Sequence, residues 1–319
     1  MTAKVSILIP VYNREDLISE CIQSALDQTF LDFEVIVVDN KSEDRTFEIC
    51  QDFAKRDPRV KVFQNDTNIG PVRNWQACAD KATGEFCKIL FSDDVLMSTC
   101  LEKMVPRLAD PDIAFVFCSA LIGETLDKSI VAYDLGGVND LASEDYVKHV
   151  LRSKVPVSPG AVLLRTEDLK RNLKTDFPTA IRQPFAQHGA GPDVMIMLLT
   201  SLNYQRIAHI RDKVVFFRAH QGSFSVADAG GLIQEGYEKA FCYFLRKNTG
   251  GKSWIEYVSR IWLKRMKKQK RFVGLRSFIL EHEGTGQTSE IFLAIIFAAC
   301  NSFSFLRSRI GTKILHPLK

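Results

Sequence analysis

The 319-residue sequence lacks several patterns that would assign it to a common class of protein. None of its eight cysteines belongs to a CxxC pair, so a zinc cluster is not expected. No GxGxxG follows the first apolar run, which removes the fingerprint of a dinucleotide-binding domain. The "GGKS" at 250–253 imitates a phosphate-binding loop, but Arg246 stands where that motif requires its first glycine. A GxSxG nucleophile elbow is also absent.

The sequence also has little net charge and no long uninterrupted apolar run. A net charge of +4 is too small to indicate nucleic acid, and the basic stretch "KRMKKQKR" (264–271) alone does not justify such a partner. The run "IFLAIIFAACNSFSFL" (291–306) is broken by polar residues, whereas a membrane-spanning helix needs about 20 apolar residues. Together, residues 264–306 predict peripheral contact with an anionic membrane surface. The alternative is a solvated basic face followed by a core-packing helix.

Two features indicate the compartment. The cysteines are scattered through apolar patterns, as expected of reduced thiols that pack as small hydrophobic residues. The N-terminal apolar stretch is only six residues long, which predicts a first strand rather than a signal peptide. We therefore expect a cytoplasmic protein, with peripheral attachment to the inner membrane face as a further hypothesis.

Four apolar runs in the first hundred residues predict strands of a parallel sheet covered on both faces: 5–10, 33–39, 60–64 and 86–91. Helical patterns separate them, over 14–28, after Ser42 as an N-cap, and from Gly70-Pro71 onward. This alternation predicts an α/β, doubly wound architecture. Later patterns predict strands over 113–122, 158–165 and 214–225, a buried helix over 193–202, and helices in 232–319.

Polar side chains follow each of the four predicted strands. Tyr12-Asn13-Arg14 comes after the first, Asp39-Asn40 after the second, Asn65-Asp66 after the third and Asp93-Asp94 after the fourth. Asn and Asp are also ordinary turn residues, so each cluster alone could be a simple turn. In a parallel sheet, however, ligands bind outside the carboxyl ends of the strands. Four such clusters in succession predict one binding crevice.

The stretch "KILFSDDVL" (88–96) places two adjacent carboxylates directly after a buried strand. Adjacent like charges at such a place repel each other and lose hydration. Asp93 and Asp94 therefore suit a hard divalent cation, Mg²⁺ or Mn²⁺, whose other ligands would be phosphate oxygens and water. A glycosidase would instead separate its two carboxylates by roughly 5–10 Å across a sugar.

Six motifs, in order, resemble those of family 2 glycosyltransferases. They are "SILIPVYNRE", "VIVVDNKSEDRT", "NIGPVRNWQ", "LFSDDVL", "GPDVMIML" and "FFRAHQGSFS", and they extend over about residues 4–226. The resemblance implies an inverting enzyme with the GT-A fold: a Rossmann-like sheet, and a smaller mixed sheet on the acceptor side. It implies one domain over 1–231, with 1–99 binding the nucleotide sugar and 100–231 carrying the acceptor side and the base. Residues 232–319 would form a basic, amphipathic helical appendage.

The resemblance also implies roles for individual residues. Asp193 would be the catalytic base, Asp94 and His220 would bind the metal, and Gly160 would mark the acceptor loop. The remaining positions would bind the nucleotide sugar: Pro10, Val11, Tyr12, Asn13, Asp39, Arg73, Asp93 and Arg218. The implied substrates are a nucleotide-sugar donor, UDP-linked, and a glycan or lipid-linked glycan acceptor, as in surface polysaccharide assembly.

Three positions depart from the family pattern. Phe91 stands where an acidic residue usually precedes the aspartate pair, Pro192 replaces the glutamate before the base, and Asn40 stands where a second aspartate is common. Two alternatives therefore stay open. A sugar nucleotidyltransferase would release pyrophosphate from UTP, although "PVYNRE" is not its usual glycine-rich loop. A catalytically silent subunit would bind nucleotide sugar without turnover.

Overall fold

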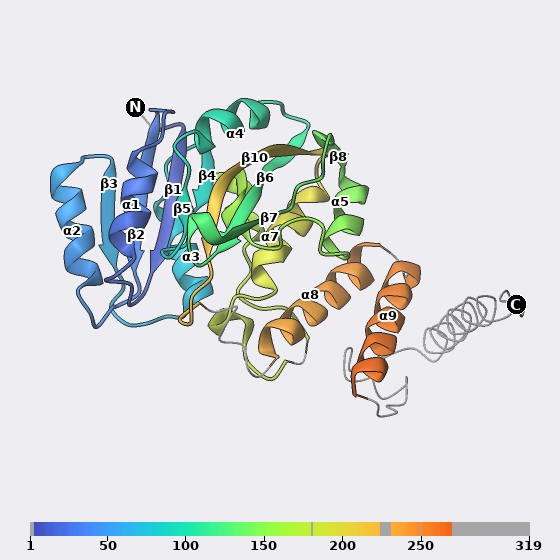
Figure 1. Ribbon diagram of the computed structural model, residues 1–319. Coiled ribbons are helices and arrows are strands. Elements are labelled where there is room, and N and C mark those ends of the chain that lie inside the picture. The colour runs from blue at the N-terminus through green and yellow to red at the C-terminus, as the bar shows by residue number, and fades with distance from the viewer. Residues whose placement is uncertain (1–2, 180, 224–230, 250, 270–319) are drawn as a thin grey trace, which may run out of the picture. The chain divides into compact units, whose positions relative to one another are not determined.

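A computed structural model describes residues 3–179, 181–223, 231–249 and 251–269 of the chain (Figure 1). The chain divides into two compact units. The first contains Met1–Asp176 and Gln183–Tyr237, and the second contains Phe177–Arg182 and Glu238–Lys319. All strands of the described chain belong to the first unit, so the candidate site is sought there.

The first unit is built on a sheet with the strand order β3-β2-β1-β4-β9-β6-β10-β5. Strands β1, β2, β3 and β4 run parallel, as do β6 and β10, while β9 lies antiparallel between β4 and β6. This mostly parallel sheet with a mixed second half confirms the predicted α/β architecture. The strand bounds are β1 Val5–Val11, β2 Phe33–Asp39, β3 Val60–Gln64, β4 Phe86–Ile89, β5 Val95–Leu96, β6 Ile113–Gly123, β7 Ser129–Ala132, β8 Asp140–Ala142, β9 Val162–Arg165 and β10 Arg206–Arg218.

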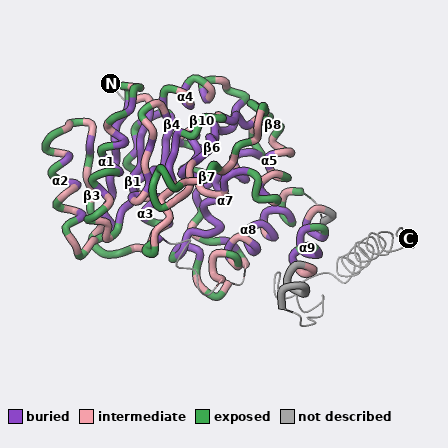
Figure 2. The backbone as a smooth tube through the Cα atoms, viewed as in Figure 1, coloured by how far each residue is buried: buried purple, intermediate pink, exposed green. Residues whose placement is uncertain are grey.

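Helices cover both faces of the sheet because β1 and β2 are apolar on both sides. Every residue of these two strands is buried, as Figure 2 shows. Side chains of α1, α2 and α4 share one apolar core with alternate residues of β1 and β2. On the other side, α3 packs against β1, β2 and α6, and α6 packs against α7. The helix bounds are α1 Ile18–Leu26, α2 Thr46–Arg56, α3 Pro71–Lys81, α4 Cys100–Leu108, α5 Ser143–Val150, α6 Thr166–Asn172 and α7 Pro192–Ser201.

Some predicted boundaries were wrong. Ser42 is not a helix N-cap: α2 begins at Thr46, and the Asp44 carboxylate accepts from the Thr46 N–H. Strand β10 begins at Arg206 rather than at 214, since its exposed middle breaks the apolar pattern. The polar stretch 123–155, ambiguous in sequence, contains β7, β8 and α5. The seven cysteines in the described residues are all free and buried, as expected.

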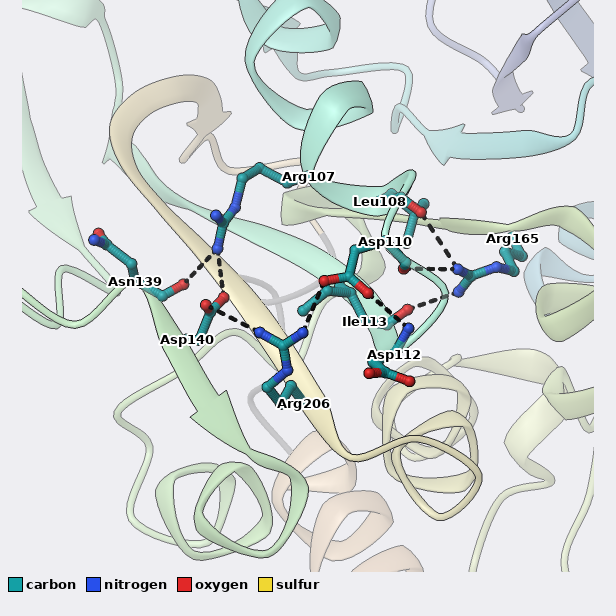
Figure 3. A network of polar contacts seen from close by, with 9 residues as sticks. All are labelled: Arg107, Leu108, Asp110, Asp112, Ile113, Asn139, Asp140, Arg165 and Arg206. Atoms are coloured by element: carbon teal, nitrogen blue, oxygen red, sulfur yellow. Dashed lines mark hydrogen bonds and ion pairs between the residues drawn. The ribbon is translucent and has the colours of Figure 1, made fainter.

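A polar network holds together the starts of β6 and β10, at the end of β10 opposite to Arg218 (Figure 3). Arg206 forms ion pairs with Asp110 at 2.7 Å and with Asp140 at 3.5 Å. Arg165 donates to the Ile113 carbonyl over 2.7 Å. Because these groups bond mainly to one another and to backbone carbonyls, we assign them to stability rather than to ligand binding.

In the described residues, the second unit consists of helical chain after Glu238 and of a short non-helical segment within Phe177–Arg182. Helix α8 (Leu232–Asn248) begins in the first unit and continues into the second, where α9 (Gly251–Gln269) follows. The rings of Phe241 and Tyr257 meet edge to face, with centroids 5.7 Å apart. No helix in the described ranges has both the length and the apolar character needed to cross a membrane. The predicted membrane-contact segment 264–306 lies largely outside the described residues.

Candidate active site

The aspartate pair lies at the carboxyl end of β4, where the sequence predicted it. Asp94 is 6% exposed, and its Oδ1 accepts from the Arg218 backbone N–H over 3.0 Å. Burial raises the pKa of Asp94 well above its usual range, and the neighbouring charge of Asp93 raises it further. The charges of Lys88 and Arg218 offset only part of this effect. The ionised form of Asp94 is therefore disfavoured here, and a cation beside it would favour that form.

The end of β10 supplies two nitrogen-bearing side chains that face the pair. His220 Nε2 lies 3.0 Å from Asp93 Oδ2, and Arg218 Nε donates to the Asp93 carbonyl over 3.2 Å. The Arg218 guanidinium also forms an ion pair with Glu20 of α1 at 2.6 Å. The structure thus brings together Asp93, Asp94, Arg218 and His220, four residues that the sequence predicted from two motifs more than 120 positions apart.

The predicted nucleotide-sugar pocket begins where β1 and β2 end. Asp39 is fully buried and accepts from the Ser42 hydroxyl, from the Ser42 N–H at 3.0 Å and from Gln64 at 2.8 Å. Ser42 Oγ in turn accepts from the Asn13 N–H over 2.9 Å. Asn13 has a positive φ of 48°, a conformation that asparagine tolerates better than most residues. Asp39 therefore orders the turn after Val11, in which Tyr12 is partly exposed.

An asparagine network connects this pocket to the start of α3. Asn40 donates to Asn68 over 2.8 Å and accepts from Asn65 and from the Ile69 N–H, each at 3.0 Å. Its amide is therefore fully engaged by the 65–70 segment. Arg73, two residues into α3, is exposed, and the described residues provide no hydrogen bond or ion pair for its guanidinium.

Gly160 lies next to Phe91, which stands two residues before the aspartate pair. A Cβ at Gly160 would meet the rings of Phe217 at 2.9 Å and Phe91 at 3.3 Å, so only glycine fits. Phe91, at the position of the missing acid, also packs on Trp75 with ring centroids 5.5 Å apart. The Gly160 carbonyl accepts from the ammonium of Lys88, which is fully buried on β4. This lysine ties the predicted acceptor loop to the strand that leads into the aspartate pair.

Asp193 lies in the first turn of α7, as predicted, but in an unexpected environment. Its Oδ1 accepts from the N–H groups of Gly191 at 2.8 Å and Val194 at 2.7 Å, and its Oδ2 accepts from the Tyr237 hydroxyl at 2.5 Å. Burial raises the pKa of Asp193 to about 7, although these three hydrogen bonds lower it. Helix α7 packs against the turn that contains Gly160. No described hydrogen bond joins Asp193 to the aspartate pair.

Sequence reasoning missed two residues of this region, Lys88 and Tyr237, and the contacts of a third, Arg14, which belongs to the predicted polar cluster after the first strand. Lys88 was taken only as part of a buried strand, and Tyr237 lies in a helical segment without a motif. Arg14 connects the two ends of the donor side: its guanidinium donates to the Asn13 carbonyl at 3.0 Å and to the Gly222 carbonyl at 3.3 Å. A lysine inside an apolar strand run was the one available signal, since a buried ammonium requires partners.

Comparisons with known proteins agree with this geometry. The protein-family model described as "Glycosyl transferase family 2" matches residues 6–159 of this chain. The GalNAc(5)-diNAcBac-PP-undecaprenol beta-1,3-glucosyltransferase of Campylobacter jejuni is 33% identical over 147 residues, 45% of this chain and 47% of that protein. The poly(ribitol-phosphate) beta-glucosyltransferase of Bacillus spizizenii is 31% identical over 184 residues, 56% of this chain and 27% of that protein. The match thus spans less than half of either relative.

Among solved structures, S. aureus TarS 1-349 in complex with UDP-GlcNAc has a similar fold. The TM-score is 0.63 at 20% sequence identity, covering 83% of this chain and 73% of that one. At this level of identity the likeness shows a shared fold. With the family match over 6–159, the motif order and the strand-end aspartate pair, this part of the chain belongs to the family 2 glycosyltransferases, and the chain has the GT-A fold.

Proposed function

We propose that this protein is an inverting glycosyltransferase that moves a sugar from a nucleoside diphosphate sugar, UDP-linked, to a hydroxyl of a glycan or lipid-linked glycan. The observation that carries the proposal is Asp193: a buried carboxylate in the first turn of α7 whose pKa is raised to about 7. A general base is most effective when its pKa lies near the working pH. The Campylobacter relative, named as acting on an undecaprenol-linked glycan, supports this acceptor class.

In the proposed reaction, the acceptor hydroxyl gives its proton to Asp193 while its oxygen bonds to the anomeric carbon of the donor sugar. The bond from that carbon to the diphosphate breaks on the opposite face, so the configuration is inverted. The departing diphosphate gains negative charge, which Arg218 and His220 would stabilise from the end of β10. Arg73, without an internal partner among the described residues, would approach the same diphosphate.

The residues at the aspartate pair fit a Mg²⁺ or Mn²⁺ ion. Asp94 is buried beside Asp93, and the described residues supply a donor to its Oδ1 but none to its Oδ2. Asp94 and His220 would hold the ion, with Asp93 beside them meeting the ribose or donor sugar. The described chain has no group of three or more such ligands, so an ion held by Asp94 and His220 would need phosphate oxygens and water as further ligands. When bound, the ion would stabilise charge on the diphosphate.

A release assay tests the proposal. Purified protein with Mn²⁺ would be offered UDP-, GDP- and dTDP-sugars, with and without a glycolipid acceptor pool, and nucleoside diphosphate would be measured. We expect release from one donor, lost in Asp94→Asn and reduced by about 10²- to 10⁴-fold in Asp193→Asn. Asp193→Asn should still bind the donor. Tight nucleotide binding without turnover would indicate the silent subunit, and pyrophosphate release from UTP would indicate a nucleotidyltransferase.

We also propose a cytoplasmic location with peripheral contact to the inner membrane face through residues 264–306. The support is the sequence pattern, six cationic residues followed by an apolar run, together with a lipid-linked acceptor in the Campylobacter relative. Co-sedimentation with anionic vesicles checks it. A protein that stays wholly in the supernatant at low salt would contradict the membrane contact.

A further inference from the structure

The side chain that touches the proposed base comes from outside all of the family motifs. Tyr237 lies on α8, 44 positions beyond Asp193, and its hydroxyl donates to Asp193 Oδ2 over 2.5 Å. The other carboxylate oxygen, Oδ1, is held by two backbone N–H groups at the start of α7. Both oxygens are therefore fixed in direction, and Oδ2 is the one that is bound only by a side chain.

The backbone next to Tyr237 is adapted to bring this hydroxyl close. A Cβ at Gly236 would lie 2.4 Å from the Ala190 carbonyl oxygen and 3.0 Å from the His188 ring. Any other residue at 236 would push the first turns of α8 away from the 188–191 segment. Gly191, which immediately precedes α7, has a φ of 117°, a conformation open to glycine but strained for other residues. A glycine thus lies next to each partner of the hydrogen bond: Gly236 before Tyr237, and Gly191 two residues before Asp193.

We propose that Tyr237 is a positioning residue for sugar transfer, which holds the Asp193 carboxylate so that Oδ2 receives the acceptor proton, and that Gly236 permits the contact. The inference rests on the proposed function of Asp193 as the base. A hydroxyl donor leaves lone pairs on Oδ2 free, because a carboxylate oxygen accepts more than one hydrogen bond. The bound carboxylate can therefore face a second hydroxyl, that of the acceptor.

The charges around Asp193 give this contact a measurable consequence. Two titratable groups face the carboxylate: Tyr237 from α8 and Tyr133 from the segment after β7. Burial, and after it the charge of Asp193, raises the pKa of both phenols, which therefore stay neutral near pH 7. The Tyr237 hydrogen bond lowers the pKa of Asp193, against the larger effect of burial. Removing the hydroxyl must then raise the pKa of Asp193, whereas a contact that only supports packing would leave it unchanged.

The test is Tyr237→Phe, which keeps the ring and deletes the hydroxyl. Tyr243→Phe is the matched control on the same helix, because the Tyr243 hydroxyl accepts from Lys247 rather than meeting Asp193. Carboxyl ¹³C-labelled aspartate would report the titration of Asp193 by NMR, with the signal assigned by its loss in Asp193→Asn. The pH profile of kcat/KM would be measured on the same proteins.

We expect the Asp193 midpoint to move upward in Tyr237→Phe and to stay in place in Tyr243→Phe. A rise of one pH unit would lower kcat/KM about tenfold on the acid side, with recovery at high pH. Gly236→Ala should shift the midpoint in the same direction, whereas Gly137→Ala, at a position with nothing within 4 Å, should not. An unmoved midpoint in both Tyr237→Phe and Gly236→Ala would overturn the proposal. If the midpoint moves in these variants but the wild-type protein shows no turnover, the proposed function is overturned and the contact between Tyr237 and Asp193 stands.

Discussion

His220 Nε2 lies 3.0 Å from Asp93 Oδ2, although the two residues are 127 positions apart in the chain. The other ring nitrogen, Nδ1, accepts from the Gly222 N–H over 3.2 Å, so Nε2 carries the proton in this structure and donates a hydrogen bond to the carboxylate. A metal ion held by Nε2 would displace this proton. The residues that follow β10 are thereby attached to the residues that follow β4. The donor site is assembled by this contact rather than by either segment alone.

Replacing His220 should therefore weaken nucleotide binding. We expect His220→Ala to raise the Kd for the nucleoside diphosphate with Mn²⁺ about tenfold, because a hydrogen bond to a charged group contributes about 1.5 kcal/mol. Calorimetric titration measures this Kd. His149→Ala, which removes a histidine bonded to a backbone carbonyl of its own helix, is the control and should not change it. Equal affinity in both variants would contradict the role of His220.

The buried Asp193 predicts opposite effects of pH on stability and on activity. Its pKa is raised from 3.8 to about 7 in the folded protein, so the folded state holds the proton more tightly than the unfolded state does. The contribution of Asp193 to the free energy of unfolding is then largest below about pH 4. It falls as pH rises toward 7, by about 4 kcal/mol at most. Activity should rise through the same interval as the base loses its proton.

Urea unfolding of the wild type and of Asp193→Asn at several pH values checks the stability effect. The variant has no titrating group at this position, so the difference in free energy of unfolding between the two proteins should change between pH 4 and 7. A constant difference across this interval would show that Asp193 titrates normally.

Lys88 should be costly to replace although it is not proposed to touch substrate. Its ammonium donates to the Gly160 carbonyl and to the Ile89 carbonyl at 3.4 Å. Lys88→Met leaves these carbonyls without a donor and removes a positive charge near Asp94. We expect the free energy of unfolding to fall by about 2–4 kcal/mol, measured in urea. Lys103→Met, which breaks only a surface ion pair with Asp212, should cost less than about 1 kcal/mol.

Asn40→Asp should disturb the loop before α3. The new carboxylate cannot donate to Asn68 Oδ1, which also accepts from the Gly70 N–H over 3.0 Å. Two acceptors would then face each other, and we expect a loss of about 1–3 kcal/mol in stability together with a higher KM for the donor. Thermal unfolding and donor kinetics measure both effects. Asn203→Asp, at an exposed position, is the control. A variant of wild-type stability would contradict the network.

Removal of divalent metal should abolish turnover without unfolding the protein. We expect EDTA to stop nucleoside diphosphate release, and added Mn²⁺ or Mg²⁺ to restore it, because the ion is proposed to stabilise the leaving diphosphate. The far-ultraviolet circular dichroism spectrum should not change, since the core of the first unit is apolar and does not include the aspartate pair. Full activity after exhaustive chelation would contradict a metal role for Asp94.

The part of the fold that could be predicted is the part in which local pattern and burial agree. The run 33–39 coincides with β2, in which every residue is buried. The run 60–64 coincides with β3, although only Val60 of that strand is buried. The aspartate pair and His220 were located because motifs carry them. By contrast, Ser42 was misread, because its hydroxyl bonds with Asp39 across the turn, a partner that spacing does not reveal.

The partners of the site could not be predicted for a related reason. Tyr237 reaches Asp193 only because α8 approaches the start of α7, and nothing near Tyr237 in the sequence signals that approach. Lys88 finds its acceptor 72 positions away. Such contacts depend on how helices and strands pack together. The local pattern of a single sequence does not reveal that packing. The roles of all the predicted site residues stay predictions.

The ring of Phe91 has a consequence for the order of binding. By packing on Trp75 and against Gly160, it fills a position from which a carboxylate could have supplied another ligand. With so few protein oxygens at the site, the diphosphate would supply further ligands to the divalent ion, and the ion would stabilise the charge of the diphosphate. Their affinities would then be reciprocally coupled: whichever binds first strengthens the second by the same factor. The protein would take up metal and donor as a single complex rather than store metal on its own.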